Sequence, residues 1–573
     1  MENSTHRPTP KRWRVSPLIP PHLNSELEEF PSLLRQLMYN RGITDYGAAR
    51  AYVDCAPGAE TNPFLIKDMD AAVEILRRAL QEKNPIAIYG DYDVDGVTSS
   101  ALLYEFLMKL GHTPRVYIPS RFDEGYGLNL DAVEQLYREG IGLMITVDCG
   151  IRSIKEVALA KQLGMRVILS DHHQPGAELP PADAVINTRQ AGDPYPYKHL
   201  SGVGLAYKLA DAYLRTYPQT GVDARDWLDL VALGTVADIA PLSGENRALV
   251  RAGLDQMRAT ERQGLYSLAQ VSGIRLENIN AGNIGFGLGP RLNAAGRLDS
   301  ALAAFELLTA RDVFNAGMLA QQLDAQNAQR KDLTLRVQEQ AVQSALQADP
   351  DNPVIFAASP EFNEGVVGLA ASRVAEQLYR PAIIGSVSDT NIVASCRSIP
   401  EFNITSALDA CADLLVRYGG HSMAAGLTVS IQNARELLAR LNAIAREALR
   451  GVELVPVLEI DREIRLEHLR DEFIPQVFEA MAKLEPTGRG NPEALFCSRG
   501  CRVAAARVVG DGQHLKLTLQ AGKRTFDAIA FRQGYWLDQL PERVDIAYVF
   551  DVNNYMGRST LQLNIKDIHP AEE

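Results

Sequence analysis

Three carboxylates follow one short apolar stretch of the sequence. Residues 85–89 are apolar and bounded by Pro and Gly, which indicates a buried strand, and Asp91, Asp93 and Asp95 come directly after it. From Val97 onward apolar residues recur at helical spacing, so the acids lie between a strand and a helix. Ligands of open α/β sheets bind beyond the carboxyl ends of strands, and clustered carboxylates there suit a hard cation such as Mg²⁺ or Mn²⁺ together with a phosphate. A calcium-type loop or an acidic turn explains this motif alone equally well.

Two further predicted strands end in similar residues. Asp148 follows the strand-like residues 145–147, and Asp171, His172 and His173 come one residue after the apolar residues 167–169. A single Asp after a strand is usually a cap or a turn residue, but three strand ends that deliver Asp or His to one edge are harder to explain by capping. Asp238, at the end of the helical run 231–237, is a candidate for the same cluster.

The elements that would position these residues alternate in type. Beyond the strand at 85–89 we expect strands at 115–118, 143–147 and 166–169 and helices at 68–80, 129–138 and 153–163. Strands that alternate with helices predict a parallel, doubly wound sheet. The fold class expected for the whole chain is therefore α/β.

The remainder of the chain predicts further domains. The pattern turns helical after residue 239, with long helices rich in Gln, Ala and Leu at 303–348, and a second α/β unit begins near residue 352. Five short strand-like runs then predict a small β-barrel of the OB type. We expect an N-terminal tail and helical prefix, an α/β domain that carries the acidic motifs, a helical connector, a second α/β domain and a β-barrel, at residues 1–60, 61–240, 241–350, 351–450 and 451–573.

Composition sets the cellular context. The 573 residues carry a net charge of −13 and no apolar run long enough to span a bilayer, and the first sixteen residues lack the apolar core of a secretory signal. Six scattered cysteines fit buried thiols in a reducing compartment, so we expect a cytoplasmic protein without contact to a membrane. Cys497 and Cys501 lack the second pair that a zinc site requires. The acidic charge leaves the substrate open, because an enzyme can hold a phosphodiester in a local basic groove.

The motifs in combination resemble the DHH phosphoesterase superfamily, and within it the branch of bacterial exonucleases specific for single-stranded DNA. The resemblance covers most of the chain and rests on the segments 90–96, 147–150, 170–173, 234–238, 291–297, 395–398 and 419–422. Many superfamily members have a His where this chain has Tyr89, so Asp91 is expected to supply the missing ligand, as in that branch. The predicted barrel is consistent with the resemblance.

The resemblance implies two Mn²⁺ or Mg²⁺ ions and hydrolysis of single-stranded DNA from its 5′ end to 5′-mononucleotides, in DNA repair and recombination. If the acids and histidines converge, two ions can activate a water and stabilise both oxygens of an in-line displacement. The expected ligands are Asp91, Asp93, Asp95, Asp148, His172 and Asp238. His173 would contact the phosphate or protonate the leaving oxygen, and Asp171 would orient an imidazole.

A second set of residues is expected to bind the substrate. Most are expected at turns of the second α/β unit, and the set comprises Arg297, Arg373, Ser395, Arg397, Gly419, Gly420 and His421. In the setting that the resemblance implies, the protein would work as a monomer, with a helicase and a single-strand-binding protein as partners. A phosphodiesterase acting on short oligonucleotides or cyclic dinucleotides, and a non-catalytic DNA-binding scaffold, are the alternatives.

Overall fold

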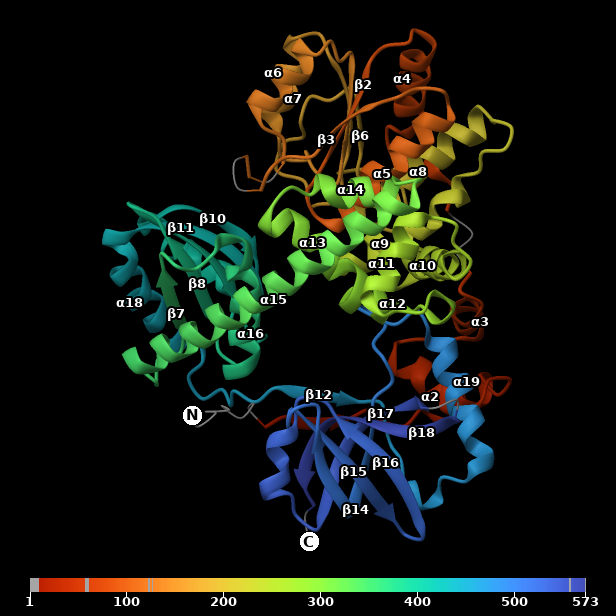
Figure 1. Ribbon diagram of the computed structural model, residues 1–573, viewed down its shortest axis with the longest axis vertical. Coiled ribbons are helices and arrows are strands. Elements are labelled where there is room, and N and C mark those ends of the chain that lie inside the picture. The colour runs from red at the N-terminus through yellow and green to blue at the C-terminus, as the bar shows by residue number, and fades with distance from the viewer. Residues whose placement is uncertain (1–9, 57–60, 122–123, 126, 556–557, 572–573) are drawn as a thin grey trace. The chain divides into compact units, whose positions relative to one another are not determined.

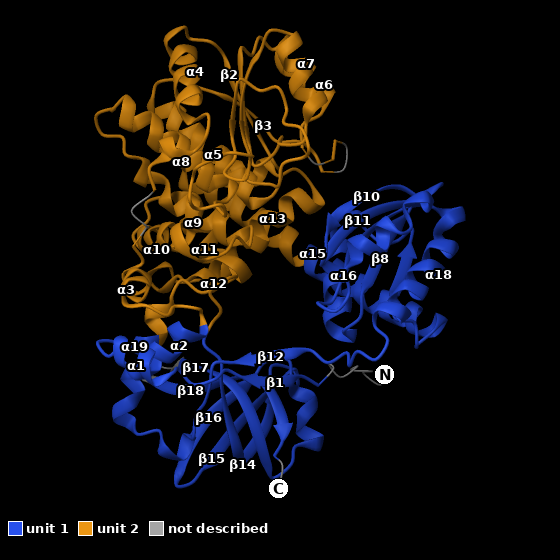
Figure 2. Cartoon of the chain, turned by 180° about the vertical axis from the view of Figure 1, so that it is seen from behind, with its two compact units in different colours: residues 1–40, 329–480, 494–573 blue, residues 41–328, 481–493 orange. Residues whose placement is uncertain are grey.

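The computed structural model describes residues 10–56, 61–121, 124–125, 127–555 and 558–571 (Figure 1). The chain divides into two compact units (Figure 2). Unit 1 comprises residues 1–40, 329–480 and 494–573, and unit 2 comprises residues 41–328 and 481–493. Within the described ranges, no helix is both long and apolar enough to cross a membrane.

Unit 2 is built around a five-stranded parallel sheet. Its strands lie in the order β3-β2-β4-β5-β6 and span, in that order, Arg115–Tyr117, Ile86–Gly90, Leu143–Val147, Arg166–Ser170 and Ala184–Ile186. The predicted strands are confirmed, and β6 is an addition. The order reverses between β2 and β4, so the carboxyl ends of these two strands form the switch point where ligands of doubly wound sheets bind.

Helices cover both faces of this sheet, as a fully buried parallel sheet requires (Figure 1). On β2, Ile86 and Ile88 join the core with α4 (Met69–Gln81), α5 (Val94–Lys109) and α8 (Gly202–Thr216), whereas Ala87 and Tyr89 join the core under α6 (Leu130–Arg138) and α7 (Ile154–Gln162). Successive side chains of β2 thus belong alternately to two cores, one on each face of the sheet.

A helical layer continues the first of these cores. Its elements are α9 (Leu228–Ala237), α10 (Gly244–Met257), α11 (Gln263–Ser272), α12 (Ala281–Asn283), the π-helix η4 (Ile284–Leu288), α13 (Gly289–Leu298) and α14 (Leu302–Thr309). The hydrophobic core that begins at Ile66 reaches Leu323, so these helices pack with the sheet. The 36-residue helix α15 (Val313–Ala348) then runs from unit 2 into unit 1.

Unit 1 contains the second α/β domain. Its mixed sheet has the order β10-β11-β9-β8-β7, with strands at Leu415–His421, Ala424–Ser430, Asn391–Arg397, Ala382–Val387 and Ile355–Ser359. Helices α16 (Glu364–Leu378), α17 (Ile404–Asp409) and α18 (Ile431–Ala448) belong to this domain. The strands β10 and β11 were not predicted, because β10 is an edge strand whose exposed residues show no apolar alternation.

The closed barrel of unit 1 confirms the predicted OB-type domain. Strands β14, β15, β16, β18 and β17 are hydrogen-bonded in that order, and β17 pairs again with β14. They span Phe496–Val509, His514–Ala521, Arg524–Ala530, Arg558–Pro570 and Arg543–Tyr555, and β13 (Arg462–Glu463) adds to β14.

The N-terminal segment contributes to both units. Strand β1 (Arg12–Val15) pairs in parallel with β12 (Val457–Ile460) in unit 1. Sequence reasoning missed this strand, because its partner lies far along the chain. Helices α1 (Pro21–Glu26), α2 (Ser32–Asn40) and α3 (Tyr46–Asp54) follow β1, and α19 (Ile474–Leu484) precedes the barrel strand β14. The predicted polar tip, residues 1–9, lies outside the described residues.

Candidate metal centre

The acidic loop after β2 is held in a fixed conformation. Asp93 caps α5, and its Oδ1 accepts hydrogen bonds from the N–H groups of Asp95 and Gly96 at 2.9 and 3.1 Å. A side chain at Gly96 would place its Cβ 2.5 Å from the carbonyl oxygen of Asp91, so only glycine fits there. The loop therefore brings Asp91, Asp93 and Asp95 together at the carboxyl end of β2.

Asp95 also binds the start of another helix. Its completely buried carboxylate accepts from the N–H groups of Gly202 at 2.6 Å and Val203 at 2.8 Å, which are the first residues of α8. A Cβ at Gly202 would lie 2.7 Å from the Cβ of Asp148, so the same helix end lies against the carboxylate that follows β4. The amino terminus of α8 thus positions two of the predicted ligands.

His172 lies at the centre of the cluster. Its Nε2 is 3.1 Å from Oδ1 of Asp148 and 3.8 Å from the nearest carboxylate oxygens of both Asp95 and Asp238. Asp238 reaches this position from the carboxyl end of α9, where it is the C-cap. Three strand ends and one helix end therefore bring these residues together.

The arrangement fits divalent cations. Ligand atoms within 4.8 Å of one another occur in three groups, namely Asp148 with His172 and His173, Asp95 with His172 and Asp238, and Asp91 with Asp93 and Asp148. The buried Oδ1 of Asp91 accepts no hydrogen bond from any described residue. Carboxylate oxygens with one or two imidazoles are a donor set for Mn²⁺ or Mg²⁺, and the overlap of the groups provides for two ions.

The electrostatics of the cluster favour the same ligands. Burial, and then the charge of Asp93, raises the pKa of Asp95 to about 7, and burial with the charge of Asp95 raises the pKa of Asp238 to about 9. Burial likewise raises the pKa values of Asp91 and Asp148 well above the usual range for a carboxyl. Burial and the charge of His173 lower the pKa of His172 to about 3, so its imidazole is neutral, which is the metal-binding form. Cations would relieve the repulsion among these carboxylates.

Asp171 and His173 form a separate pair beside the cluster. Asp171 accepts hydrogen bonds from the backbone N–H groups of Ile151 at 2.9 Å and His173 at 3.0 Å, and it lies 2.8 Å from Nδ1 of His173. Burial would raise the pKa of Asp171, but the hydrogen bond and charge of His173 lower it below its ordinary value. Burial alone would lower the pKa of His173, but Asp171 raises it to about 9, and the side chain is 43% exposed. His173 is thus a cation that a bound molecule can reach.

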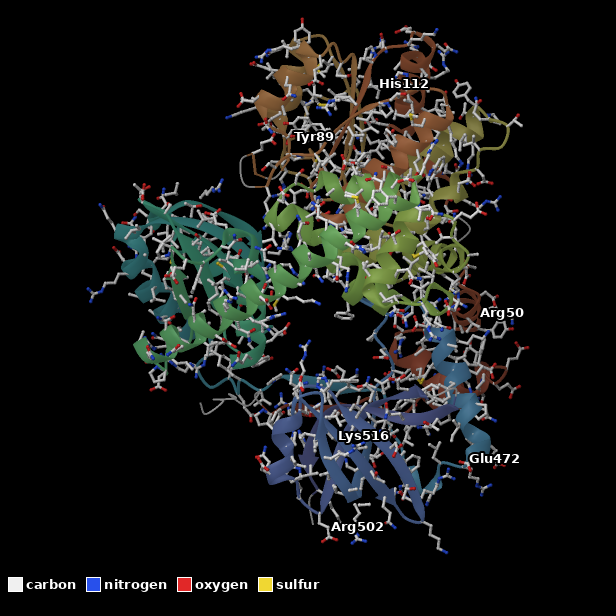
Figure 3. All side chains as sticks on the ribbon, viewed as in Figure 1. Arg50, Tyr89, His112, Glu472, Arg502 and Lys516 are labelled. Atoms are coloured by element: carbon white, nitrogen blue, oxygen red, sulfur yellow. The ribbon has the colours of Figure 1, made fainter. Side chains whose placement is uncertain are left out.

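Tyr89 replaces the histidine that many superfamily members have. It lies on β2 with a fully buried side chain (Figure 3), its hydroxyl donates to the carbonyl oxygen of Gly127 at 3.1 Å, and its ring stacks on Tyr117. It therefore belongs to the core beneath the sheet, while Asp91 occurs in one of the groups of ligand atoms.

The predicted substrate-binding residues divide between the two units. Arg297 is in unit 2, on α13, and this helix contacts the acidic loop through a hydrogen bond from the Val94 N–H to Asn293 and through Gly296, whose Cβ would lie 2.6 Å from the carbonyl oxygen of Tyr92. The other six are in unit 1, namely Arg373, Ser395, Arg397, Gly419, Gly420 and His421.

The expectation that these six lie at turns was wrong. Arg373 is inside α16, Ser395 and Arg397 are on β9, and residues 419–421 are on β10. Pairing through β11 places Ser395 in one cross-strand row with Gly419 and Arg397 in another with His421, because β11 lies between the two strands. The sheet thus aligns residues that lie far apart in the sequence.

Two arginines near the metal centre were missed. The guanidinium of Arg121 lies 5.2 Å from the ring centre of Tyr92, and its charge lowers the pKa of Asp91 against the larger effect of burial. Arg489 donates to the carbonyl oxygen of Ile239 at 3.4 Å, next to Asp238. Arg121 follows β3, so its position after a predicted strand could have marked it as a residue of the site. Arg489 could not be found in this way, because it is 250 residues from Ile239 in sequence.

Comparison with known proteins places these features in a family. Three family models match the chain: the DHH family N-terminal domain at residues 85–235, the DHHA1 domain at 351–447 and the RecJ OB domain at 460–567. The chain is 36% identical to the single-stranded-DNA-specific exonuclease RecJ of Bacillus subtilis, over 94% of this chain and 68% of that protein. It is 35% identical to RecJ of Escherichia coli, over 95% of this chain and 96% of that protein.

A solved structure agrees over nearly the whole chain. The crystal structure of RecJ in complex with Mn²⁺ from Thermus thermophilus matches with a TM-score of 0.84 at 32% identity, covering 98% of this chain and 80% of that one. The fold and the acid–histidine cluster define a DHH-family protein with an added DHHA1 domain and an OB barrel. Within that class, the chain belongs to the RecJ family.

Proposed function

We propose that the protein is an exonuclease that degrades single-stranded DNA from the 5′ end to 5′-mononucleotides, with two Mn²⁺ or Mg²⁺ ions. The convergence of Asp91, Asp93, Asp95, Asp148, His172 and Asp238 on overlapping groups of ligand atoms carries this proposal. The family supports it, because the relatives are named as single-stranded-DNA-specific exonucleases and RecJ structures are complexed with Mn²⁺ or Mg²⁺.

The six converging residues are proposed to hold the two ions, with neutral His172 as a ligand of one ion and the carboxylate of Asp148 contributing where the groups overlap. When bound, the ions supply Lewis-acid activation of water and of the phosphodiester. Asp95 is fixed by the two N–H groups of α8, so it can bind a cation without rearranging.

Asp171 and His173 are proposed to act on the substrate side of the reaction. The hydrogen bond to Asp171 holds the His173 ring and keeps a proton on Nδ1, which leaves Nε2 to face a phosphate oxygen or the leaving oxygen. With a pKa of about 9, His173 is protonated at neutral pH and can serve as a hydrogen-bond donor or as an acid.

The strand is proposed to be held by Arg297 in unit 2 and by Arg373, Ser395, Arg397, Gly419, Gly420 and His421 in unit 1. The aligned rows on β9 and β10 support this set, because a hydroxyl, an arginine, an imidazole and glycine backbone present adjacent donors to phosphate oxygens. A phosphodiesterase acting on short oligonucleotides, or on cyclic dinucleotides, would not need the closed barrel. A non-catalytic scaffold would not need to keep every expected ligand.

We further propose a monomer that works in the cytoplasm, where a helicase supplies single strands and a single-strand-binding protein is a partner in repair and recombination. The six free cysteines are consistent with a reducing compartment. Light scattering of the purified protein tests the monomer, and co-purification with single-strand-binding protein, compared with and without DNA, tests that partner.

A time course on labelled DNA tests the activity. Single strands labelled at the 5′ or the 3′ end are incubated with Mn²⁺ or Mg²⁺, and products are resolved by length. The proposal predicts immediate release of a labelled mononucleotide from the 5′ label and a shortening ladder from the 3′ label. A shortening ladder from the 5′ label would show that the protein degrades DNA from the 3′ end instead. Equal cleavage rates on blunt duplex and on single strands would show that it is not specific for single strands. Intact DNA binding without cleavage would favour the scaffold.

A further inference from the structure

The residue after Asp238 has an unusual backbone conformation. Ile239 follows the C-cap of α9 with a φ of 58°, in the left-handed region that a side chain branched at Cβ rarely adopts. Among the residues that the structure describes, eight other than glycine have a positive φ, and Ile239 is the only one of them that is β-branched. The backbone is therefore strained directly beside a proposed metal ligand.

Other helices of unit 2 end in the same hydrogen-bonding pattern with a different residue. After α9 the N–H of Ile239 donates to the carbonyl oxygen of Val236 at 3.1 Å, and the N–H of Ala240 donates to that of Thr235 at 3.2 Å. The same two hydrogen bonds end four helices in which the left-handed residue is glycine, namely Gly111 after α5, Gly140 after α6, Gly164 after α7 and Gly273 after α11. Glycine forms this pattern without strain, so the end of α9 does not itself require isoleucine.

The side chain of Ile239 does not repay the strain by packing in a core. It is 64% exposed, whereas Ala240 and Leu242 are buried. The carboxylate of Asp238, one residue earlier, lies 3.8 Å from Nε2 of His172. A single exposed apolar side chain is common on proteins, but one held in a strained conformation beside ligand atoms indicates a functional contact.

The turn that carries Ile239 is held in place by a distant segment of the same unit. The N–H of Leu242 donates to the carbonyl oxygen of Arg489 at 2.7 Å, and the guanidinium of Arg489 donates to the carbonyl oxygen of Ile239 at 3.4 Å. A Cβ at Gly490 would lie 3.3 Å from the Cβ of Pro241, so the two segments are in close contact. The apolar side chain is thus presented in a fixed position next to the metal centre.

The sugar is the part of a nucleic acid that this side chain is placed to meet. A phosphate held by ions at the cluster has a sugar directly on either side, and the bases lie farther away. Bases are usually held by stacking on flat aromatic rings, whereas a branched aliphatic side chain suits the C–H groups of a sugar. When a 5′-mononucleotide is released, its O3′ is the leaving oxygen, and C2′ is bonded to the carbon that carries this oxygen.

We propose that Ile239 packs on the C2′ side of the sugar that carries the leaving oxygen and thereby selects deoxyribose over ribose. A 2′-hydroxyl against Ile239 loses hydrogen bonds to water and gains none from this side chain. The inference rests on the proposed function for the reaction and its polarity. It adds a residue that determines which sugar the enzyme accepts.

A single ribonucleotide within a DNA strand tests this proposal. The full-length protein with Mn²⁺ digests 3′-labelled oligodeoxynucleotides in which one internal sugar is deoxyribose or ribose, and the products are resolved by length over time. The parent protein should pause when the ribonucleotide becomes the 5′-terminal residue, with its release slowed about 10- to 100-fold. Ile239→Gly and Ile239→Asn should shorten this pause at least about fivefold, and Ile239→Val should keep most of it, because valine keeps the branched apolar surface.

Lys83 provides a matched control for the change in backbone. It follows α4 with a φ of 55° and the same two hydrogen bonds, and it precedes β2 at the end of the strand opposite the acids. Lys83→Gly should keep the parent pause at the ribonucleotide. Ile239→Gly should melt no lower than the parent protein, because glycine removes the left-handed strain.

The outcomes separate this inference from the proposed function. If a folded Ile239→Gly variant keeps the parent pause, or if the parent protein does not pause at all, Ile239 does not select the sugar. A pause while the ribonucleotide is still second from the 5′ end would place the contact on the other side of the phosphate and contradict the proposal. Failure of the parent protein to cleave the all-DNA strand would instead remove the proposed function.

Discussion

The Nε2 atom of His172 lies 3.1 Å from Oδ1 of Asp148, and both side chains are almost completely buried. These residues follow neighbouring parallel strands, β5 and β4, whose register pairs Ser170 with Val147. The contact joins a neutral imidazole to a carboxyl whose pKa burial raises well above normal. Because a neutral imidazole and a carboxylate are both metal ligands, this pair is the natural point at which to test the metal centre.

Asp148→Asn should separate activity from stability. The change removes one ligand, so the cleavage rate with Mn²⁺ should fall by at least about 100-fold, more than the loss of an outer hydrogen bond usually costs. In EDTA the same variant should melt at a temperature equal to or higher than the parent protein, because a carboxyl crowded by other acids is gone. The checks are rate measurements on single strands and differential scanning fluorimetry. Near-normal cleavage would show that Asp148 holds no ion.

The contact of α8 with Asp148 gives a steric prediction. Gly202→Ala places a Cβ 2.7 Å from the Cβ of Asp148, so it should cost about 1–3 kcal/mol of stability and weaken Mn²⁺ binding. Gly204→Ala is the matched control on the same helix, since its nearest contact would be 3.4 Å. Urea unfolding and Mn²⁺ titration of both variants compare them. Equal effects of the two substitutions would mean that the position of Asp148 does not depend on Gly202.

Asp171→Asn tests the role of the pair beside the cluster. Without the negative charge, the pKa of His173 should fall from about 9 by roughly one unit or more. The cleavage rate should drop about 10- to 100-fold, and the alkaline limb of the kcat/KM profile should move to lower pH. A lower rate with an unmoved alkaline limb would assign Asp171 a purely structural role.

The metal-free protein should lose stability as pH rises from about 6.5 to 9. The folded-state pKa values of Asp95, Asp238 and His173 are about 7, 9 and 9, each above the ordinary value. Folding therefore binds protons, and the stability present below the ordinary pKa is lost as pH rises through the folded one. His172, with a pKa of about 3, acts in the opposite direction but only below about pH 6.5.

Melting temperatures in EDTA and in Mn²⁺ at about pH 6.5, 7.5 and 8.5 check this dependence. The melting temperature in EDTA should fall across the series, and the gain from Mn²⁺ should grow, since deprotonated carboxylates bind the ion. The Asp148→Asn, Asp238→Asn double variant should show a flatter series. A melting temperature in EDTA that rises with pH would mean that the carboxylates are not under the strain described here.

The positions of the ligands could be predicted because each follows a strand or helix with a clear hydrophobic pattern. Asp91, Asp148 and His172 come after apolar runs that the structure shows as β2, β4 and β5, and parallel strands bring their carboxyl ends to one edge. The barrel strands were visible for the same reason, because buried and partly buried residues alternate along β15.

What could not be predicted depends on partners distant in sequence. Strand β10 has no apolar alternation of its own and forms by pairing with β11, so Gly419, Gly420 and His421 were placed at a turn. Strand β1 forms only by pairing with β12, which begins at Val457, far along the chain. These relationships arise from tertiary packing, which local patterns do not encode.

The most direct test of the metal centre is anomalous diffraction from crystals of this protein grown with Mn²⁺, measured at the manganese edge. We predict two peaks about 3.5–4 Å apart, each at about 2.0–2.3 Å from ligand atoms of the cluster, with His172 on one of the two ions. A single peak would contradict the two-ion assignment. No peak at this cluster, in crystals of protein that cleaves single-stranded DNA with Mn²⁺, would contradict the account as a whole.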